Sequence, residues 1–182
     1  LALLAGEKSL GFEVAREALG SSVSRVAISA YHLDPARIGT FDLVVCGSLM
    51  LHLRDPVRAL EAIRSVCSGW LLSIEQVSVP LSVALRRRPV AEMRFDEELC
   101  QWWVVNLAGH RRMVEIAGFE VTDAMGPFTE PFGAGHPSFS AARRRRPALG
   151  TRLSRYVGSD RDGVPHAALL ARPRLHAPPI RT

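Results

Sequence analysis

The chain has 182 residues, of which 47% are hydrophobic and 23% are charged, and its formal net charge at pH 7 is +5. This length suits one domain with a sizeable core. The sequence shows neither an apolar stretch long enough to span a bilayer nor a signal-peptide pattern, so we expect a cytoplasmic protein that does not bind a membrane. Cys46, Cys67 and Cys100 are widely spaced and odd in number, which favours reduced thiols over a disulfide framework or a metal site.

The positive charge lies mainly near the end of the chain. From Arg143 onward the sequence has 10 arginines and 2 aspartates, whereas the residues before Arg143 carry 13 basic and 16 acidic side chains. The runs Arg86–Arg88 and Arg143–Arg146 have the charge to contact the phosphates of RNA. Such runs are also common on solvated surfaces, so both interpretations stay open.

Hydrophobic patterns predict an alternation of helices and strands. The first elements are a helix over Glu7–Leu19, a strand over Ser24–Ala30, a short turn over Pro35–Ile38 and a strand that begins at Phe41. Later helices are predicted over Pro56–Val66 and Leu107–Ala117, and later strands over Trp70–Glu75, Phe119–Met125 and Val164–Ala171. This order is typical of a mostly parallel sheet with crossover helices.

The stretch from Phe41 to Leu60 is the most informative part of this pattern. Its apolar, β-branched start predicts a central strand, and the small residues Cys46–Ser48 would let a ligand approach the backbone closely. Asp55 before Pro56 predicts a capped helix start. Since ligands of open α/β sheets bind at the carboxyl ends of strands, we expect the working edge at Cys46–His52.

Two regions interrupt the alternation. Residues 77–105 are predicted to form a helical cap over the carboxyl edge of the sheet, and Pro127–Pro137 a loop. Nearer the end, we predict a short helix over Leu149–Val157 and a disordered tail over 175–182.

The segment FDLVVCGSLMLHLRDP, Phe41–Pro56, resembles the FD-strand–G-x-LxH-x-x-DP segment of class I S-adenosylmethionine (SAM)-dependent methyltransferases, and GWLLSIE at Gly69–Glu75 extends the likeness. The branch that contains the tRNA wobble-uridine carboxymethyltransferase is the most similar. The resemblance runs from about Gly6 to Pro173. It implies a Rossmann-like fold whose antiparallel last strand lies between its neighbours, with SAM as cofactor and methyl transfer to a small molecule or tRNA.

The chain lacks the family's acidic-G-x-G-x-G turn, since its lone G-x-G falls within Phe132–His136. We therefore expect a partial methyltransferase domain over residues 1–174 that lacks its amino-terminal strand–helix–strand and is an incomplete catalyst as this fragment. The truncated sheet edge would invite pairing with a second copy.

The resemblance also implies the cofactor site. Ala30 and Tyr31 would contact the adenine of SAM, and Cys46 and Gly47 would lie beside its methionine part. Tyr31 as an ordinary half-buried aromatic, and Gly47 as a residue required by a tight turn, are the alternatives.

Carboxy-SAM is a poorer fit than SAM. The wobble-uridine enzyme recognises the extra carboxylate with a tyrosine and an arginine, and Leu51 and His166 stand at those positions here. Leu51 has no donor and His166 is only partly cationic, so we predict ordinary SAM and a substrate-binding role for His166.

His52 is the predicted catalytic base, because it falls in the expected cleft and its imidazole suits proton transfer near neutrality. A structural role in capping the loop is the alternative. Arg94, Trp102 and Trp103 would bind an anionic or planar acceptor, unless the tryptophans are core residues and the arginine a surface residue. Glu75 would either orient an acceptor or bind a backbone amide.

Two other classes of protein remain as alternatives. A non-catalytic interaction module would keep the sheet, lose SAM, and bind RNA or a protein through its sheet surface and basic tail. A nicotinamide-dependent Rossmann enzyme also needs the missing glycine turn, and an antiparallel closing strand fits it badly.

Overall fold

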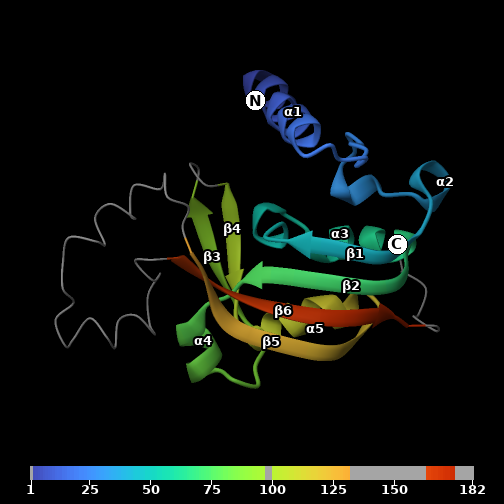
Figure 1. The fold of residues 1–182 in the computed structure, drawn as a ribbon. Helices are drawn as coiled ribbons and strands as arrows, with labels where there is room; N and C mark the ends of the chain where they lie inside the picture. Colours follow the sequence, from blue (N-terminus) through green and yellow to red (C-terminus); the bar gives the residue numbers. More distant parts are fainter. Residues whose placement is uncertain (1, 97–99, 132–162, 175–182) are drawn as a thin grey trace, which may run out of the picture.

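The computed structural model describes residues 2–96, 100–131 and 163–174, and its centre is a four-stranded sheet (Figure 1). The strand order is β1 (Phe41–Gly47), β2 (Cys67–Gln76), β6 (Gly163–Pro173) and β5 (Phe119–Pro131). β1 pairs with β2 in parallel, and β6 lies antiparallel to both β2 and β5. Three strands therefore share one direction, and the predicted Rossmann-like sheet with an inserted antiparallel last strand is confirmed.

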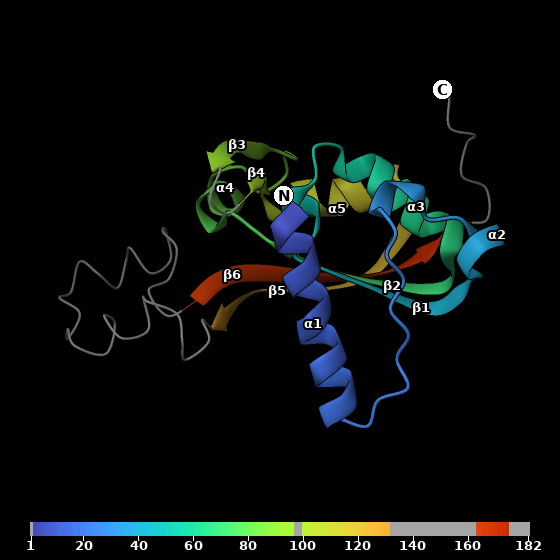
Figure 2. The ribbon, with the colours of Figure 1, turned by 90° about the horizontal axis from the view of Figure 1, so that it is seen from above.

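Two helices, α3 (Pro56–Val66) and α5 (Leu107–Ile116), cover one face of this sheet (Figure 2). The predicted start of α3 is confirmed, because the Asp55 side chain accepts a hydrogen bond from the Arg58 amide and Pro56 opens the helix. The core between these helices and the sheet contains fully buried side chains: Leu60, Leu71, Val114 and Phe119. None of the described helices is long and apolar enough to cross a membrane.

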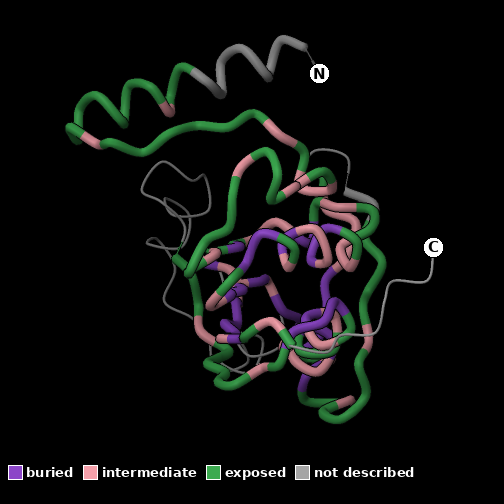
Figure 3. Tube along the Cα trace, turned by 90° about the vertical axis from the view of Figure 1, so that its right-hand side faces the viewer, coloured by how far each residue is buried: buried purple, intermediate pink, exposed green. Residues whose placement is uncertain are grey.

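The opposite face of β1 is open to solvent. Phe41, Leu43 and Val45 alternate along the strand and are 45%, 57% and 59% exposed. The first helix, α1 (Ala2–Ala18), is held away from the sheet, and Figure 3 shows its second half and the segment after it almost wholly exposed. An apolar sheet surface without a covering layer is a place where another segment or chain can pack.

The predicted strand over Ser24–Ala30 is wrong. Residues 21–29 have no regular structure. A short 3-10 helix, η1 (Ala30–His32), follows, and α2 (Pro35–Ile38) comes after it. Val26 and Ile28 favour extended backbone, but a strand also needs a hydrogen-bonded neighbour. Among the described residues, β1 pairs only with β2, so this segment has no partner strand.

Among the described residues of the predicted helical cap over residues 77–105, only α4 (Val79–Ala84) is helical. Two strands, β3 (Ala91–Asp96) and β4 (Gln101–Val105), form a separate antiparallel sheet in this region. The aromatic and β-branched residues of β4 favour a strand, and the buried side chain of Asn106 joins the hairpin to the body.

The structure also differs from the sequence prediction at the end of β5. The strand continues through Pro131, where a loop was expected, because Phe128–Pro131 pair with residues 163–166 of β6. The predicted helix over Leu149–Val157, the Arg143–Arg146 run and the tail over 175–182 lie outside the described residues.

Candidate functional site

The carboxyl edge of the sheet is formed by the end of β1, the end of β2 and the loop that leads into η2 (Met50–His52). Glu75, near the end of β2, holds this loop: its Oε1 accepts hydrogen bonds of 3.1 Å from the amides of both Leu49 and Met50. Of the two roles expected for Glu75, the structure therefore shows the binding of backbone amides. This places Gly47 and Ser48 at the start of a fixed turn.

Glu75 is only 1% exposed. Burial raises its pKa from the ordinary value of 4.5 to about 7, although the amides of Met50, Leu49 and Leu51 act in the opposite direction. Burial, together with the charge of Glu75, also raises the pKa of the Cys46 thiol to about 12. Cys46 is therefore a neutral thiol at physiological pH.

The shift at Glu75 makes stability depend on pH. The folded chain keeps the proton up to about pH 7, whereas the unfolded chain releases it near pH 4.5. The stabilising contribution is thus complete below pH 4.5 and lost as the pH rises through 7, a change on the order of 3 kcal/mol.

The substitution Glu75→Gln should remove this dependence, because the amide oxygen still accepts from Leu49 and Met50 but carries no proton to lose. Urea denaturation between pH 4.5 and 8 measures this. We expect wild type to lose unfolding free energy relative to the variant as the pH rises through this range. Burial lowers the pKa of His110 to about 4, but His110 is present in both proteins, so its titration does not change the difference between them. Parallel pH profiles for the two proteins would contradict this prediction.

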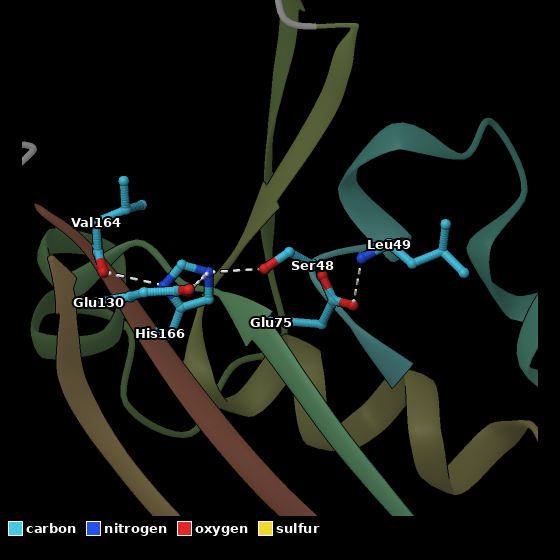
Figure 4. A network of polar contacts seen from close by, with 6 residues as sticks. All are labelled: Ser48, Leu49, Glu75, Glu130, Val164 and His166. Atoms are coloured by element: carbon cyan, nitrogen blue, oxygen red, sulfur yellow. Dashed lines mark hydrogen bonds and ion pairs between the residues drawn. The ribbon is translucent and has the colours of Figure 1, made fainter. Parts of the chain in front are cut away.

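A second polar network lies beside this loop (Figure 4). It connects the end of β1 with β5 and β6. Ser48 Oγ is 2.9 Å from Nε2 of His166, and Glu130 Oε2 is 3.3 Å from the same nitrogen. Nδ1 of His166 is 3.0 Å from the carbonyl oxygen of Val164. Sequence reasoning found His166 but not Ser48 or Glu130, because Ser48 and His166 are 118 positions apart and no local spacing connects them.

The hairpin of β3 and β4 contacts the same loop. The indole Nε1 of Trp103 donates a 2.6 Å hydrogen bond to the carbonyl of Leu53, and the guanidinium of Arg54 lies 4.5 Å from the ring centre of Trp102. His52 Nδ1 is 3.1 Å from the carbonyl oxygen of Cys100. A carbonyl only accepts, so Nδ1 carries a proton and Nε2 of the neutral ring is free of one.

A small cavity of about 110 Å³ lies between the loop and the hairpin. Its lining is mostly apolar and includes Met50, Leu51, Trp103 and Met113, with Glu75 as its charged group. Such a cavity would accept an apolar group that carries one hydrogen-bond donor.

Arg94 is not part of that cavity. It lines a second one of about 220 Å³ beside α4 and forms an exposed ion pair with Glu92, with Nε 3.2 Å from Oε1. The structure thus brings Trp103 to the loop but does not place Arg94 and Trp103 in one pocket.

The predicted cofactor residues lie on two segments. Gly47 is exposed at the end of β1, and a Cβ built on it would meet no atom of the described residues within 4 Å, so its backbone is open to a ligand. Tyr31, next to Ala30 in η1, is half-buried against the core, and its hydroxyl accepts a 3.1 Å hydrogen bond from the Asp55 amide. Among the described residues there is no cluster of three or more potential metal ligands.

Comparison with known proteins gives a likeness in structure only. No family model and no curated protein sequence matches the chain. Among solved structures, a candidate methyltransferase from Bacillus halodurans aligns with a TM-score of 0.55 at 17% identity, over 89% of this chain and 78% of its own. The [4+2]-cyclase SpnF aligns with a TM-score of 0.51 at 19% identity, over 89% of this chain and 61% of its own. The chain therefore spans less than two thirds of SpnF.

These likenesses show the fold alone: a mixed α/β, Rossmann-like sheet that this chain shares with the methyltransferase and cyclase structures. They do not fix the reaction, because one of the two structures is described as a cyclase and one fold hosts several chemistries.

Proposed function

We propose that this chain is part of a SAM-dependent methyltransferase and that the carboxyl edge of β1 supplies the methionine side of its cofactor site. The observation that carries the proposal is Gly47: it ends a strand of a fold shared with methyltransferases, no atom of the described residues lies within 4 Å of a Cβ built on it, and Glu75 fixes the loop that follows. Small residues at such strand ends allow a ligand to approach the backbone.

The residues present fit SAM through backbone and ring contacts. The backbone of Cys46 and Gly47 would face the methionine part, and Ala30 with the ring of Tyr31 would face the adenine. When bound, SAM supplies an electrophilic methyl group, so the work of the protein is to position the acceptor and exclude water. His52 would take the acceptor's proton at Nε2, because the Cys100 carbonyl holds the proton of Nδ1.

A small molecule is the acceptor that this geometry supports best. The cavity of about 110 Å³ beside Glu75 and Trp103 is apolar and too small for a polynucleotide. Arg86–Arg88 are exposed and support tRNA as the alternative. Binding of tRNA would weaken steeply as salt rises, whereas binding of a neutral small molecule would hardly change.

The uncovered face of β1 favours a second candidate, a non-catalytic module or homo-oligomer that packs through Phe41, Leu43 and Val45. Titration of the chain with SAM in a calorimeter separates the two. We expect saturable heat with SAM and none with NADH. The absence of binding, together with a dimer in analytical ultracentrifugation, would favour the interaction module.

A further inference from the structure

We propose that Ser48 is a nucleophilic serine, with His166 as its general base, that takes acyl or phosphoryl groups from activated esters. Ser48 Oγ lies 2.9 Å from Nε2 of His166. The carbonyl of Val164 can only accept, so its 3.0 Å contact with Nδ1 places a proton on that nitrogen. Nε2 of the neutral ring is then an acceptor and receives the hydroxyl proton of Ser48.

The backbone aims Ser48 at this base. Its φ of 46° lies in the left-handed region, which residues other than glycine rarely adopt and which is concentrated at functional sites. Ser48 directly follows β1 and precedes η2, so it occupies a sharp turn between a strand and a helix, as the nucleophile of an α/β-hydrolase does. The flanking glycines of the hydrolase pattern G-x-S-x-G are both absent, since Cys46 and Met50 stand two positions before and after Ser48.

Glu130 completes the arrangement from β5. Its carboxylate is 3.3 Å from Nε2 of His166, and its side chain is 59% exposed, whereas that of His166 is 6% exposed. The negative charge stabilises the imidazolium that forms when His166 takes the serine proton. Because Ser48 is only half-buried, a reagent can reach the pair from the solvent side.

The reaction follows from these positions. Ser48 Oγ bonds to the carbonyl carbon or phosphorus of the ester, and its proton passes to Nε2 of His166. The bond to the leaving group then breaks, and an alcohol leaves with that proton; with a fluorophosphonate, fluoride leaves instead.

We expect slow turnover, because the backbone amides next to Ser48 that could stabilise an oxyanion already donate hydrogen bonds to another group. The N–H groups of Leu49 and Met50 donate to Glu75 at 3.1 Å. Loss of one such donor costs on the order of 10²–10³ in rate, so we expect a stable covalent adduct more than rapid hydrolysis.

The chain contains its own matched control. Ser73 Oγ is also 2.9 Å from a histidine, Nε2 of His110, but Ser73 and His110 are 0% and 1% exposed. Reaction at Ser48 and none at Ser73 would show that access and the strained turn matter in addition to the hydrogen bond.

The test is labelling of the whole chain with a fluorophosphonate probe at pH 8, with the adduct located by peptide mass spectrometry. We expect one adduct at Ser48, formed at least about tenfold more slowly in His166→Gln and at the wild-type rate in Ser73→Ala. Thermal unfolding checks that each variant is folded. If His166→Gln does not fold, Glu130→Gln at the surface replaces it, with labelling expected to be about threefold slower.

The proposal would be overturned if the probe formed no adduct at Ser48. It would also be overturned if the probe labelled wild type and folded His166→Gln (or Glu130→Gln in its place) at the same rate. The labelling does not involve SAM, so its outcome is separate from that of the proposed methyltransferase function.

Discussion

Replacement of Asn106 by alanine is expected to lower the free energy of unfolding by about 4 kcal/mol. Asn106 is fully buried, and its side chain uses its full hydrogen-bonding capacity. Oδ1 accepts from the amides of Val90 and Gly109 at 3.1 and 2.7 Å, and Nδ2 donates to the carbonyls of Leu85 and Arg88 at 3.1 and 2.9 Å. One side chain thus caps α5 and holds the segment between α4 and β3.

Alanine would remove the cap of α5 and leave the amides of Val90 and Gly109 without their partner. Each unsatisfied buried group costs about 1–3 kcal/mol, which explains why the effect exceeds that of an ordinary cap. Urea denaturation measures it. Asp34→Ala is the matched control, because Asp34 also caps a helix but makes one exposed hydrogen bond, to the Ala36 amide. We expect about 1 kcal/mol or less there. Equal losses of unfolding free energy in Asn106→Ala and Asp34→Ala would show that the buried hydrogen bonds of Asn106 add nothing beyond an ordinary helix cap.

The second large effect is expected at Gly47, where Gly47→Val should weaken SAM binding at least about tenfold, or 1.4 kcal/mol. A side chain there enters space that is open in the free protein and that we assign to the cofactor. The backbone of Gly47 has an ordinary negative φ, so stability should change by no more than about 0.5 kcal/mol.

Gly11→Ala serves as the control for Gly47→Val. A Cβ at Gly11 also meets no atom of the described residues within 4 Å, but Gly11 lies on α1 and not on a strand of the sheet. Calorimetric titration of the three proteins with SAM should show weaker binding in Gly47→Val alone. Unchanged affinity in that variant would remove Gly47 from the site.

The sequence predicted best those elements whose signals are local. Asp55 and Pro56 mark the start of α3, and the predicted helix ends at Val66 as the observed one does. The closing strand was also predictable, because an apolar run such as Val164–Ala171 is typical of a strand buried between two others.

The errors arise where distant residues decide the structure. Val26 favours a strand, but no strand in the described part of the chain lies beside the segment Ser24–Ala30 to pair with it. The fold of β3 and β4 depends on contacts with other elements, namely the bond of Trp103 to Leu53 and the bonds of Asn106. These contacts do not follow from helical or strand periodicity.

The candidate site was predictable only in part for the same reason. The family resemblance pointed to the strand end and to His166, but it carried no signal for the partners of that histidine. Ser48 comes from the turn after β1 and Glu130 from an extension of β5 that the sequence predicted as a loop. Only the pairing of β5 with β6 brings Glu130 to His166.

Titration with SAM, followed through backbone amide chemical shifts, tests whether the carboxyl edge of β1 binds the cofactor. We expect the largest shifts at Gly47 and Ser48, with a second group at Ala30 and Tyr31. No shifts, or shifts confined to the open face of β1 around Leu43 and Val45, would contradict it.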